Sequence, residues 1–285
     1  MHDKQYLNCN GKIFNADKLF ISPNNRSFRY GDGFFETMKM INGEIMLPDY
    51  HFERLFASLE LLQFEKPNYF TVDYLKKSIE ELAKQNHHSK LARIRLMIYR
   101  GDGGLYDPEN HFPNHLIQTW NLNAANNTLN ENGLIIDIFK DSKKACDNYS
   151  HIKSNNYLSY VMAALWAKKN HLNDVLLLNS YNRIADATIA NVFIVKDGSV
   201  KTPALTEGCV SGVMRRHLLA CMRKENIPIE ETKIEVEELL EASEAFLTNG
   251  VYGIRWVKSC GNSNYTNELS TFLHKKFIHD AFIAE

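Results

Sequence analysis

The segment from Leu91 to Tyr99 alternates apolar and polar side chains, and this two-residue period constrains the fold more than any other feature of the chain. One side of the alternation carries Ile94, Leu96 and Ile98, and the other carries Arg93, Arg95, Met97 and Tyr99. Successive side chains of a β-strand point to opposite faces, so the pattern predicts a strand with one buried face. Polar side chains along its other face suggest a solvated or ligand-facing surface.

Turn and helix signals surround this strand. Asn10-Gly11 interrupts the strand formers of 6–14, and Asn42-Gly43 follows those of 34–41, so both pairs predict β-hairpins. Helical spacing begins after Pro48, and Thr71 can cap a further helix. The later chain predicts strands at 134–139, 174–178, 191–196 and 245–248, and helices at 157–169, 212–224 and 268–278. These elements do not alternate regularly, which indicates a mixed α/β (α+β) architecture.

The length of 285 residues favours one large domain or two of medium size. Residues 121–133 include six asparagines and little apolar content, as is typical of a segment between domains. We therefore expect a small N-terminal domain at 1–122, a linker at 123–132 and a larger C-terminal domain at 133–285.

Charge and cysteine content exclude several classes of protein. The formal net charge is −1 without a basic cluster, so a nucleic-acid partner is not expected. No apolar run is long enough to span a bilayer, and no signal-peptide pattern follows Met1, so we expect no membrane association. The five cysteines are scattered and show no Cys-x-x-Cys spacing, which disfavours disulfides and metal sites and favours a reducing cytoplasm.

Five motifs occur in a particular order along the chain. They are Arg29-Tyr30-Gly31-Asp32-Gly33-Phe34-Phe35-Glu36-Thr37 with His51-Phe52-Glu53-Arg54-Leu55 after it, then His151–Leu158, Ile184–Phe193, Gly208–Arg215 and Thr248–Ile254. Together they resemble the class IV aminotransferases, in particular D-amino acid aminotransferases and aminodeoxychorismate lyases, over residues 5 to 260. The resemblance implies the two-domain fold of D-amino acid aminotransferase, which is fold type IV of the enzymes that use pyridoxal 5′-phosphate (PLP).

The same resemblance implies roles at the cofactor. Lys153 would form the imine with PLP and then move a proton. Tyr157 would contact the ring hydroxyl, and Asp186 would keep the pyridine nitrogen protonated so that the ring accepts electrons. Arg54 would bind the phosphate together with residues from two later turns, namely Gly212, Val213, Met214, Thr248, Asn249 and Gly250.

The chain departs from the family pattern at two of these positions. Asp186 stands where glutamate is usual, and its side chain is shorter by one methylene, so the ring, the strand or a water molecule must make up the difference. Met214 stands where many members have threonine, which removes one hydroxyl but leaves the backbone amide.

Substrate recognition is less defined by the sequence. A small amino substrate with carboxylates needs cationic partners, and Arg100 is the first candidate because a flexible glycine-rich run follows it. Arg93 and Arg95 come next, and Phe35 is expected beside the substrate. The family builds its active site between two subunits, so the resemblance also implies a homodimer.

Three family activities compete. The loop at Asn249 and the run Val257-Lys258-Ser259-Cys260-Gly261 resemble aminodeoxychorismate lyases, which favours elimination of pyruvate to give 4-aminobenzoate. The alternatives are a D-amino acid aminotransferase and a branched-chain aminotransferase, of which the latter is disfavoured because its members carry a different loop. A non-catalytic PLP-binding protein is the remaining alternative, although such a protein usually loses its lysine first.

Overall fold

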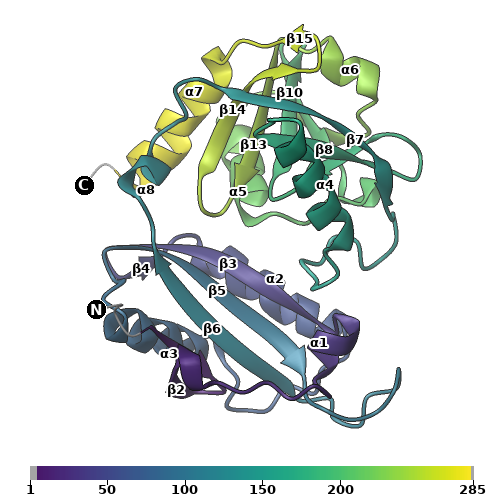
Figure 1. Ribbon diagram of the computed structural model, residues 1–285. Coiled ribbons are helices and arrows are strands. Elements are labelled where there is room, and N and C mark those ends of the chain that lie inside the picture. Colours follow the sequence, from purple (N-terminus) through teal and green to yellow (C-terminus); the bar gives the residue numbers. More distant parts are fainter. Residues whose placement is uncertain (1–4, 284–285) are drawn as a thin grey trace. The chain divides into compact units, whose positions relative to one another are not determined.

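A computed structural model describes residues 5–283 (Figure 1). The chain forms two compact units, one consisting of residues up to Ala124 together with Lys153–Asn156, the other of Ala125–Ile152 and the residues from Tyr157 onward. The first unit thus ends close to the expected boundary at 122. It differs from the expectation in that 153–156 belongs to the first unit, although this segment follows the linker. Residues 1–4 and 284–285 of the expected domains lie outside the described part.

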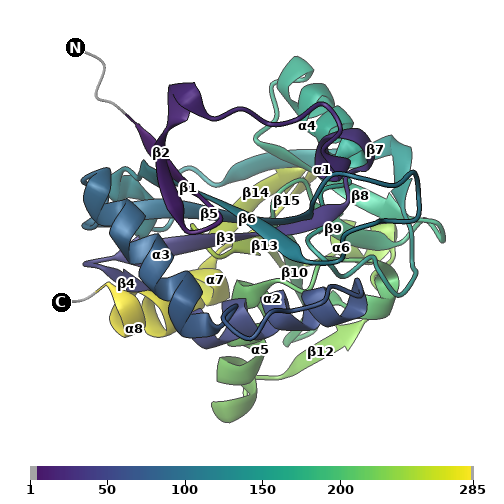
Figure 2. The same cartoon turned by 90° about the horizontal axis from the view of Figure 1, so that it is seen from below.

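The first unit contains a six-stranded antiparallel sheet in the order β2-β1-β6-β5-β3-β4. Its strands are β1 (Tyr6–Cys9), β2 (Lys12–Asn15), β3 (Gly33–Ile41), β4 (Glu44–Ile45), β5 (Leu91–Arg100) and β6 (Pro113–Asn121). Its helices are η1 (Ala16–Lys18), α1 (Arg26–Tyr30), α2 (Pro48–Leu61) and α3 (Val72–Gln85). Helices α2 and α3 pack against one face of this sheet (Figure 2).

Local sequence explains these elements. Asn10 and Gly11 have φ values of 51° and 81°, and Asn42 and Gly43 have 51° and 88°, as a two-residue hairpin turn requires. Both predicted hairpins are therefore confirmed. The side chains of Ile94, Leu96 and Ile98 are fully buried, with 0% exposed, so the alternation of β5 separates a core face from its other face.

A buried ionic group ties α2 to β3. The Glu36 carboxylate accepts hydrogen bonds from Arg54 Nε at 2.7 Å and Arg54 Nη2 at 2.5 Å, and it lies 2.6 Å from His51 Nδ1. Burial raises the pKa of Glu36, but the Arg54 charge and the hydrogen bonds from His51 and Arg54 outweigh it and lower the pKa to about 2. Burial lowers the pKa of His51, so the imidazole is neutral near pH 7 and donates Nδ1–H to the carboxylate.

The second unit contains a nine-stranded mixed sheet in the order β12-β11-β10-β13-β14-β7-β8-β9, with β15 paired to β14. Its strands are β7 (Leu134–Lys144), β8 (Asp174–Asn179), β9 (Ile184–Ala187), β10 (Asn191–Lys196), β11 (Ser199–Pro203), β12 (Ile229–Thr232), β13 (Glu244–Asn249), β14 (Gly253–Cys260) and β15 (Ser263–Asn264). Its helices are η2 (Ala124–Asn127, which begins at the boundary), α4 (Leu158–Lys169), η3 (Leu205–Glu207), α5 (Val213–Lys224), α6 (Val236–Leu240), α7 (Glu268–His274), the π-helical η4 (Lys275–His279) and α8 (Asp280–Phe282).

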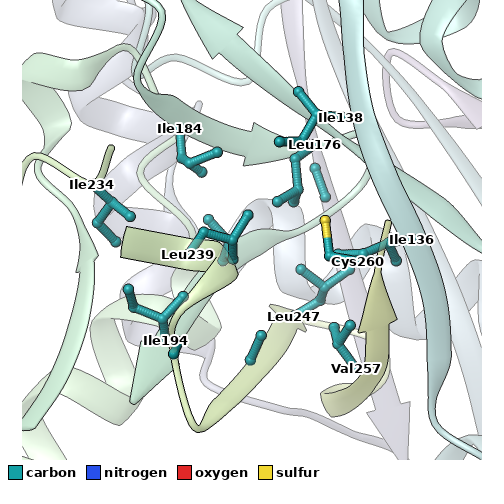
Figure 3. Close-up of a cluster of buried hydrophobic side chains, with 14 of the residues drawn as sticks. Ile136, Ile138, Leu176, Ile184, Ile194, Ile234, Leu239, Leu247, Val257 and Cys260 are labelled. Carbon is teal, nitrogen blue, oxygen red and sulfur yellow. The ribbon is translucent and has the colours of Figure 1, made fainter. Parts of the chain in front are cut away.

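The core of this unit fills one side of the sheet. Ile136, Leu176, Ile194 and Leu247 come from four different strands and pack in one cluster, which Leu239 of α6 also joins (Figure 3). A second cluster lies between α4 and the strands β7 and β8, and it contains Phe139, Tyr160, Ala163, Ala167, Val175 and Leu177. Burial of these side chains from water stabilises the packing of α4 on the sheet.

Specific contacts hold the asparagine-rich segment against β14. Asn130 Nδ2 donates to the Trp256 carbonyl at 2.9 Å, and its Oδ1 accepts from Trp256 N at 3.0 Å. The Trp256 indole Nε1 donates to the Asn130 carbonyl at 2.6 Å. The polar composition that suggests a linker therefore serves to pair this segment with β14.

Most predicted elements are present, with small differences at their ends. The predicted helix at 268–278 is α7, which ends at His274 and continues as the π-helical η4. Strand β7 extends to Lys144, beyond the predicted end at 139. Strands β6, β9, β11, β12, β14 and β15 and helices α1 and α6 have no counterpart among the predicted elements. Among residues 5–283, no helix combines the length and apolar character needed to cross a membrane.

The Glu36 group gives a first prediction. Glu36→Gln should destabilise the protein near neutral pH, because it removes the charge that Arg54 pairs with. The pKa of Glu36 is lowered on folding, so this stabilisation is complete above about pH 4.5 and is lost as the pH falls toward about 2. The pKa shift corresponds to an effect on the order of 3 kcal/mol. Urea unfolding from about pH 7 to about pH 3 measures the free energy of unfolding.

Glu60→Gln is the matched control, since Glu60 is exposed on the same helix. The difference between wild type and Glu36→Gln should shrink as the pH falls, while Glu60→Gln follows wild type throughout. A difference that stays constant with pH would contradict the ionised state of Glu36.

Candidate active site

The segment that carries Lys153 belongs to the first unit and pairs with β3 through an isolated β-bridge. Phe35 N donates to the Lys153 carbonyl at 3.0 Å, and Asn155 N donates to the Gly33 carbonyl at 3.0 Å. Phe34 and Ser154 form an antiparallel bridge between these bonds. The backbone of Lys153 is thus fixed against the start of β3.

The glycines of the first motif allow this pairing. A Cβ on Gly33 would lie 2.4 Å from the Ile98 carbonyl oxygen and 2.8 Å from Asn155 Nδ2. Gly31 has a φ of 68°, and a Cβ there would lie 2.4 Å from Asn156 Oδ1. Any larger residue at these two positions would displace either the lysine segment or β5. The segment with Gly31 and Gly33 therefore packs directly against the segment that carries Lys153.

Two cations lie at the ring of Phe35. Lys153 Nζ is 4.8 Å from the ring centroid, and Arg95 Cζ is 3.7 Å from it. The three residues meet because Phe35 and Arg95 project from the same face of adjacent strands, where Phe35 pairs with Met97 and Thr37 with Arg95. The first unit thus places a guanidinium and the amine of Lys153 at one aromatic ring.

The expected substrate role of Arg100 is not supported by its surroundings. Its guanidinium donates to Asp32 Oδ1 at 3.1 Å, to the Gln63 carbonyl at 3.3 Å and to the Leu62 carbonyl, and it stacks on Phe64 at 4.1 Å. The side chain is buried and satisfies carbonyls at the end of α2, where a helix leaves such groups without partners. Arg100 is therefore part of the framework of the first unit.

Arg93 and Arg54 also have defined positions. Arg93 is exposed and stacks on Trp120, with its Cζ 4.9 Å from the ring. Arg54 is paired with Glu36, and this contact holds the guanidinium plane in place. A fixed guanidinium loses little further freedom when it binds an anion such as a phosphate.

In the second unit, Asp186 is a buried carboxylate on β9. Its Oδ2 accepts hydrogen bonds from Tyr160 OH at 2.9 Å and from Val210 N at 3.1 Å. Lys144 Nζ lies 3.7 Å from the same oxygen. A buried carboxylate with a nearby cation and two hydrogen-bond donors is the kind of group that a cationic ring nitrogen would need opposite it. Tyr157 is the N-terminal cap residue of α4, and its ring stacks on Tyr160 at 4.7 Å.

A turn rich in backbone donors leads into α5. Gly212 is the N-cap residue and no side chain caps the helix, so the first amides of α5, including those of Val213 and Met214, remain available for an anion. A Cβ on Gly212 would lie 1.8 Å from Asn191 Oδ1, so glycine is required here. The Met214 side chain is buried, which leaves its amide as its contribution.

The end of β13 lies beside this turn. Thr248 pairs with Asn191, whose side-chain amide donates to the Val210 carbonyl at 2.7 Å. The Thr248 hydroxyl is buried and has no hydrogen-bond partner within residues 5–283. Asn249 Oδ1 accepts from Val251 N and Tyr252 N, both at 2.9 Å, and so shapes the turn that contains Gly250.

Four residues that contact the candidate site residues were not predicted from the sequence. Glu36 and His51 lie in the first motif and in the segment after it, but their pairing with Arg54 depends on the approach of α2 to β3. Tyr160 is three residues after Tyr157, and helical spacing alone places both on one face of α4. Lys144 carried no signal, because the predicted strand ended before it.

Comparisons with known proteins indicate the family of this chain. The family model described as amino-transferase class IV matches residues 33–260. The chain is 30% identical over 231 residues to an aminodeoxychorismate lyase of Vibrio harveyi, covering 80% of this chain and 83% of the relative. It is 25% identical over 250 residues to a D-alanine aminotransferase of Listeria monocytogenes, covering 84% and 82%.

A solved structure shows the same fold. The branched-chain aminotransferase of Thermoproteus uzoniensis superposes with a TM-score of 0.86 at 22% identity, covering 97% of this chain and 94% of the other. The expected fold is thereby confirmed. The extent of the family match, together with the similarity to the Vibrio lyase over most of both chains, identifies the chain as a member of the class IV aminotransferase family.

Proposed function

We propose that this protein is a PLP-dependent enzyme that eliminates pyruvate from aminodeoxychorismate to give 4-aminobenzoate. The observation that carries the cofactor assignment is the donor set of the second unit. A buried hydroxyl without a partner among the described residues, Thr248, lies beside the uncapped start of α5. The buried Asp186 carboxylate is bonded to Val210, two residues before the helix cap. A phosphate dianion and a protonated pyridine nitrogen are the groups that such donors and such a carboxylate suit.

We assign the phosphate to Arg54, to the amides of Gly212, Val213 and Met214, and to Thr248 with the Asn249–Gly250 turn. PLP, when bound, supplies an aldehyde that condenses with amines and a ring that accepts electrons. Lys153 is proposed to bind the aldehyde. The freed Lys153 amine would then remove the proton from the substrate carbon that bears the nitrogen. Tyr157 is assigned to the ring hydroxyl.

The lyase is favoured over a transaminase by the similarity to aminodeoxychorismate lyases and by the loop at Asn249. Loss of that proton and departure of the enolpyruvyl group leave an aromatic ring, whose stability drives the reaction. A D-alanine-type transaminase is the second candidate, because one of the relatives has that activity at similar coverage. A branched-chain aminotransferase stays third, supported by the fold and by 27% identity over 257 residues to a putative branched-chain-amino-acid aminotransferase of Methanocaldococcus jannaschii.

We propose Arg95 as the first partner of a substrate carboxylate. Its guanidinium and the Lys153 amine lie at the same ring, that of Phe35. A carboxylate held at Arg95 would therefore be near the reacting amine. Arg93, which is exposed on the same strand, is the second choice. The homodimer and the cytoplasmic location are retained as proposals that follow from the family resemblance and the cysteine content.

The cofactor lysine has a direct test. Borohydride should reduce the bond between PLP and the protein, and peptide mass spectrometry should locate the adduct on Lys153. Lys153→Ala should abolish turnover yet retain some PLP, because the phosphate contacts remain. In the control variant Lys143→Ala, which changes an exposed lysine, the adduct should stay on Lys153. An adduct on another lysine would contradict the assignment.

The reaction type is decided by products. Wild-type protein should release pyruvate from aminodeoxychorismate without a keto-acid acceptor, because elimination needs no second substrate. Coupled lactate dehydrogenase measures the pyruvate, and chromatography measures 4-aminobenzoate. If D-alanine converts the bound cofactor to its amine form and a keto acid restores it, the protein is a transaminase.

Three arginine variants test substrate recognition. Arg95→Met should lower kcat/KM by roughly 100-fold with the cofactor spectrum unchanged, because it leaves a substrate carboxylate without its partner. Arg93→Met should have a much smaller effect. Arg100→Met should instead lower the melting temperature, since it unpairs Asp32 and the end of α2. A large loss of kcat/KM in Arg93→Met alone would reverse the order of the first two.

A further inference from the structure

Tyr160 joins several groups of the second unit. Its hydroxyl donates to Asp186 Oδ2 at 2.9 Å and accepts from Lys144 Nζ. Its ring stacks on Tyr157, with centroids 4.7 Å apart and planes inclined by 30°, and Lys144 Nζ lies 4.6 Å from the ring centroid. One side chain therefore contacts both Tyr157 and Asp186, residues proposed to engage two different atoms of the cofactor ring.

The position of Tyr160 follows from the packing of α4. Tyr157 and Tyr160 are three residues apart at the start of the helix and so share one face. That face lies over β7 and β8, where Tyr160 joins the apolar cluster of Phe139, Ala163 and Leu177. Asp186 pairs with Leu177 across β8 and β9, which brings the carboxylate under the Tyr160 hydroxyl.

The donors and acceptors among Tyr160, Asp186 and Lys144 are defined. Burial and the charge of Asp186 raise the pKa of Tyr160, so the phenol is neutral and its proton points at the carboxylate. Lys144 Nζ donates to the phenol oxygen and also lies 3.7 Å from Asp186 Oδ2. Together with Val210 N, these contacts fix the position of Oδ2 and thereby the rotation of the whole Asp186 carboxylate.

We propose that Tyr160 is a positioning residue for the cofactor, which orients the Asp186 carboxylate through its hydroxyl and the Tyr157 ring through stacking. The inference rests on the proposed function, since it is there that Asp186 and Tyr157 contact PLP. It adds a residue that acts through Asp186 and Tyr157. Tyr160 would affect the dissociation constant of PLP and the affinity of the PLP ring for a proton.

Tyr160→Phe tests the hydroxyl alone, because the ring and its stacking on Tyr157 are kept. Loss of one hydrogen bond to a buried carboxylate should weaken PLP binding to the apoprotein by roughly tenfold. The carboxylate, with one donor fewer, should also bind a nearby proton more tightly. The absorbance of the bound cofactor should therefore titrate at a higher pH, by a few tenths of a unit or more. Fluorescence titration and a spectrophotometric pH titration give the two values.

Ser159→Ala is the matched control, since it removes a hydroxyl from the neighbouring residue, whose bond is to Ser142 at 2.7 Å. It should leave the dissociation constant of PLP and the spectral midpoint as in wild type. Lys144→Met gives a second measurement with Tyr160 intact. It should shift the midpoint in the same direction as Tyr160→Phe, because it too removes a group that stabilises the Asp186 charge.

The results distinguish a failure of the role proposed for Tyr160 from a failure of the proposed function. If wild type binds PLP and Tyr160→Phe matches it in both affinity and midpoint, the role of Tyr160 is wrong and the proposed function stands. If wild type binds no PLP, both are wrong. If Tyr160→Phe fails to fold, an unshifted midpoint in Lys144→Met would overturn the inference, and the expected upward shift would support it.

Discussion

The pairing of residues 153–156 with the start of β3 is the contact on which the arrangement of the first unit's functional groups depends. Two backbone hydrogen bonds at 3.0 Å hold this segment, and they form only because Gly33 has no side chain in the space between β5 and Asn155. The pairing fixes the Lys153 backbone beside β3, in a sheet that α2 and α3 cover on one face. A lysine whose backbone is paired with a strand holds its amine in one place more effectively than a lysine on a mobile loop.

Each unit contains a buried carboxylate at the candidate site, and its charge is compensated in a different way in each. Glu36 is paired with the guanidinium of Arg54 and accepts a hydrogen bond from a neutral histidine. Asp186 has a lysine at 3.7 Å and donors from a phenol and a backbone amide. Burial of a charge without such partners would cost several kcal/mol. Glu36 fixes the Arg54 guanidinium, which we assign to the PLP phosphate. Asp186 is itself assigned to the pyridine nitrogen of PLP.

Three arginines of β5 have the same charge but different surroundings, and only the surroundings indicate which of them could bind a substrate. Arg93, Arg95 and Arg100 belong to one strand and carry the same charge, yet their surroundings differ completely. Arg100 is enclosed by carbonyls and Asp32, Arg93 lies exposed on Trp120, and Arg95 lies on the ring that Lys153 also contacts. Alternation along β5 distinguishes Arg100 from the other two, since it points to the core face. It does not distinguish Arg95 from Arg93.

The sequence by itself determined many of the local elements and the family. The two Asn-Gly hairpins, the capped helix at Thr71, the alternation of β5 and the order of the five motifs all depend on neighbours in the chain. Tertiary structure decided the contacts between distant residues, such as Arg100 with the end of α2, Asn130 with Trp256, and Lys144 and Tyr160 with Asp186. A side chain's charge and spacing do not reveal which carbonyl or carboxylate will lie opposite it. That depends on how strands pair and helices pack, and many residues share in those interactions.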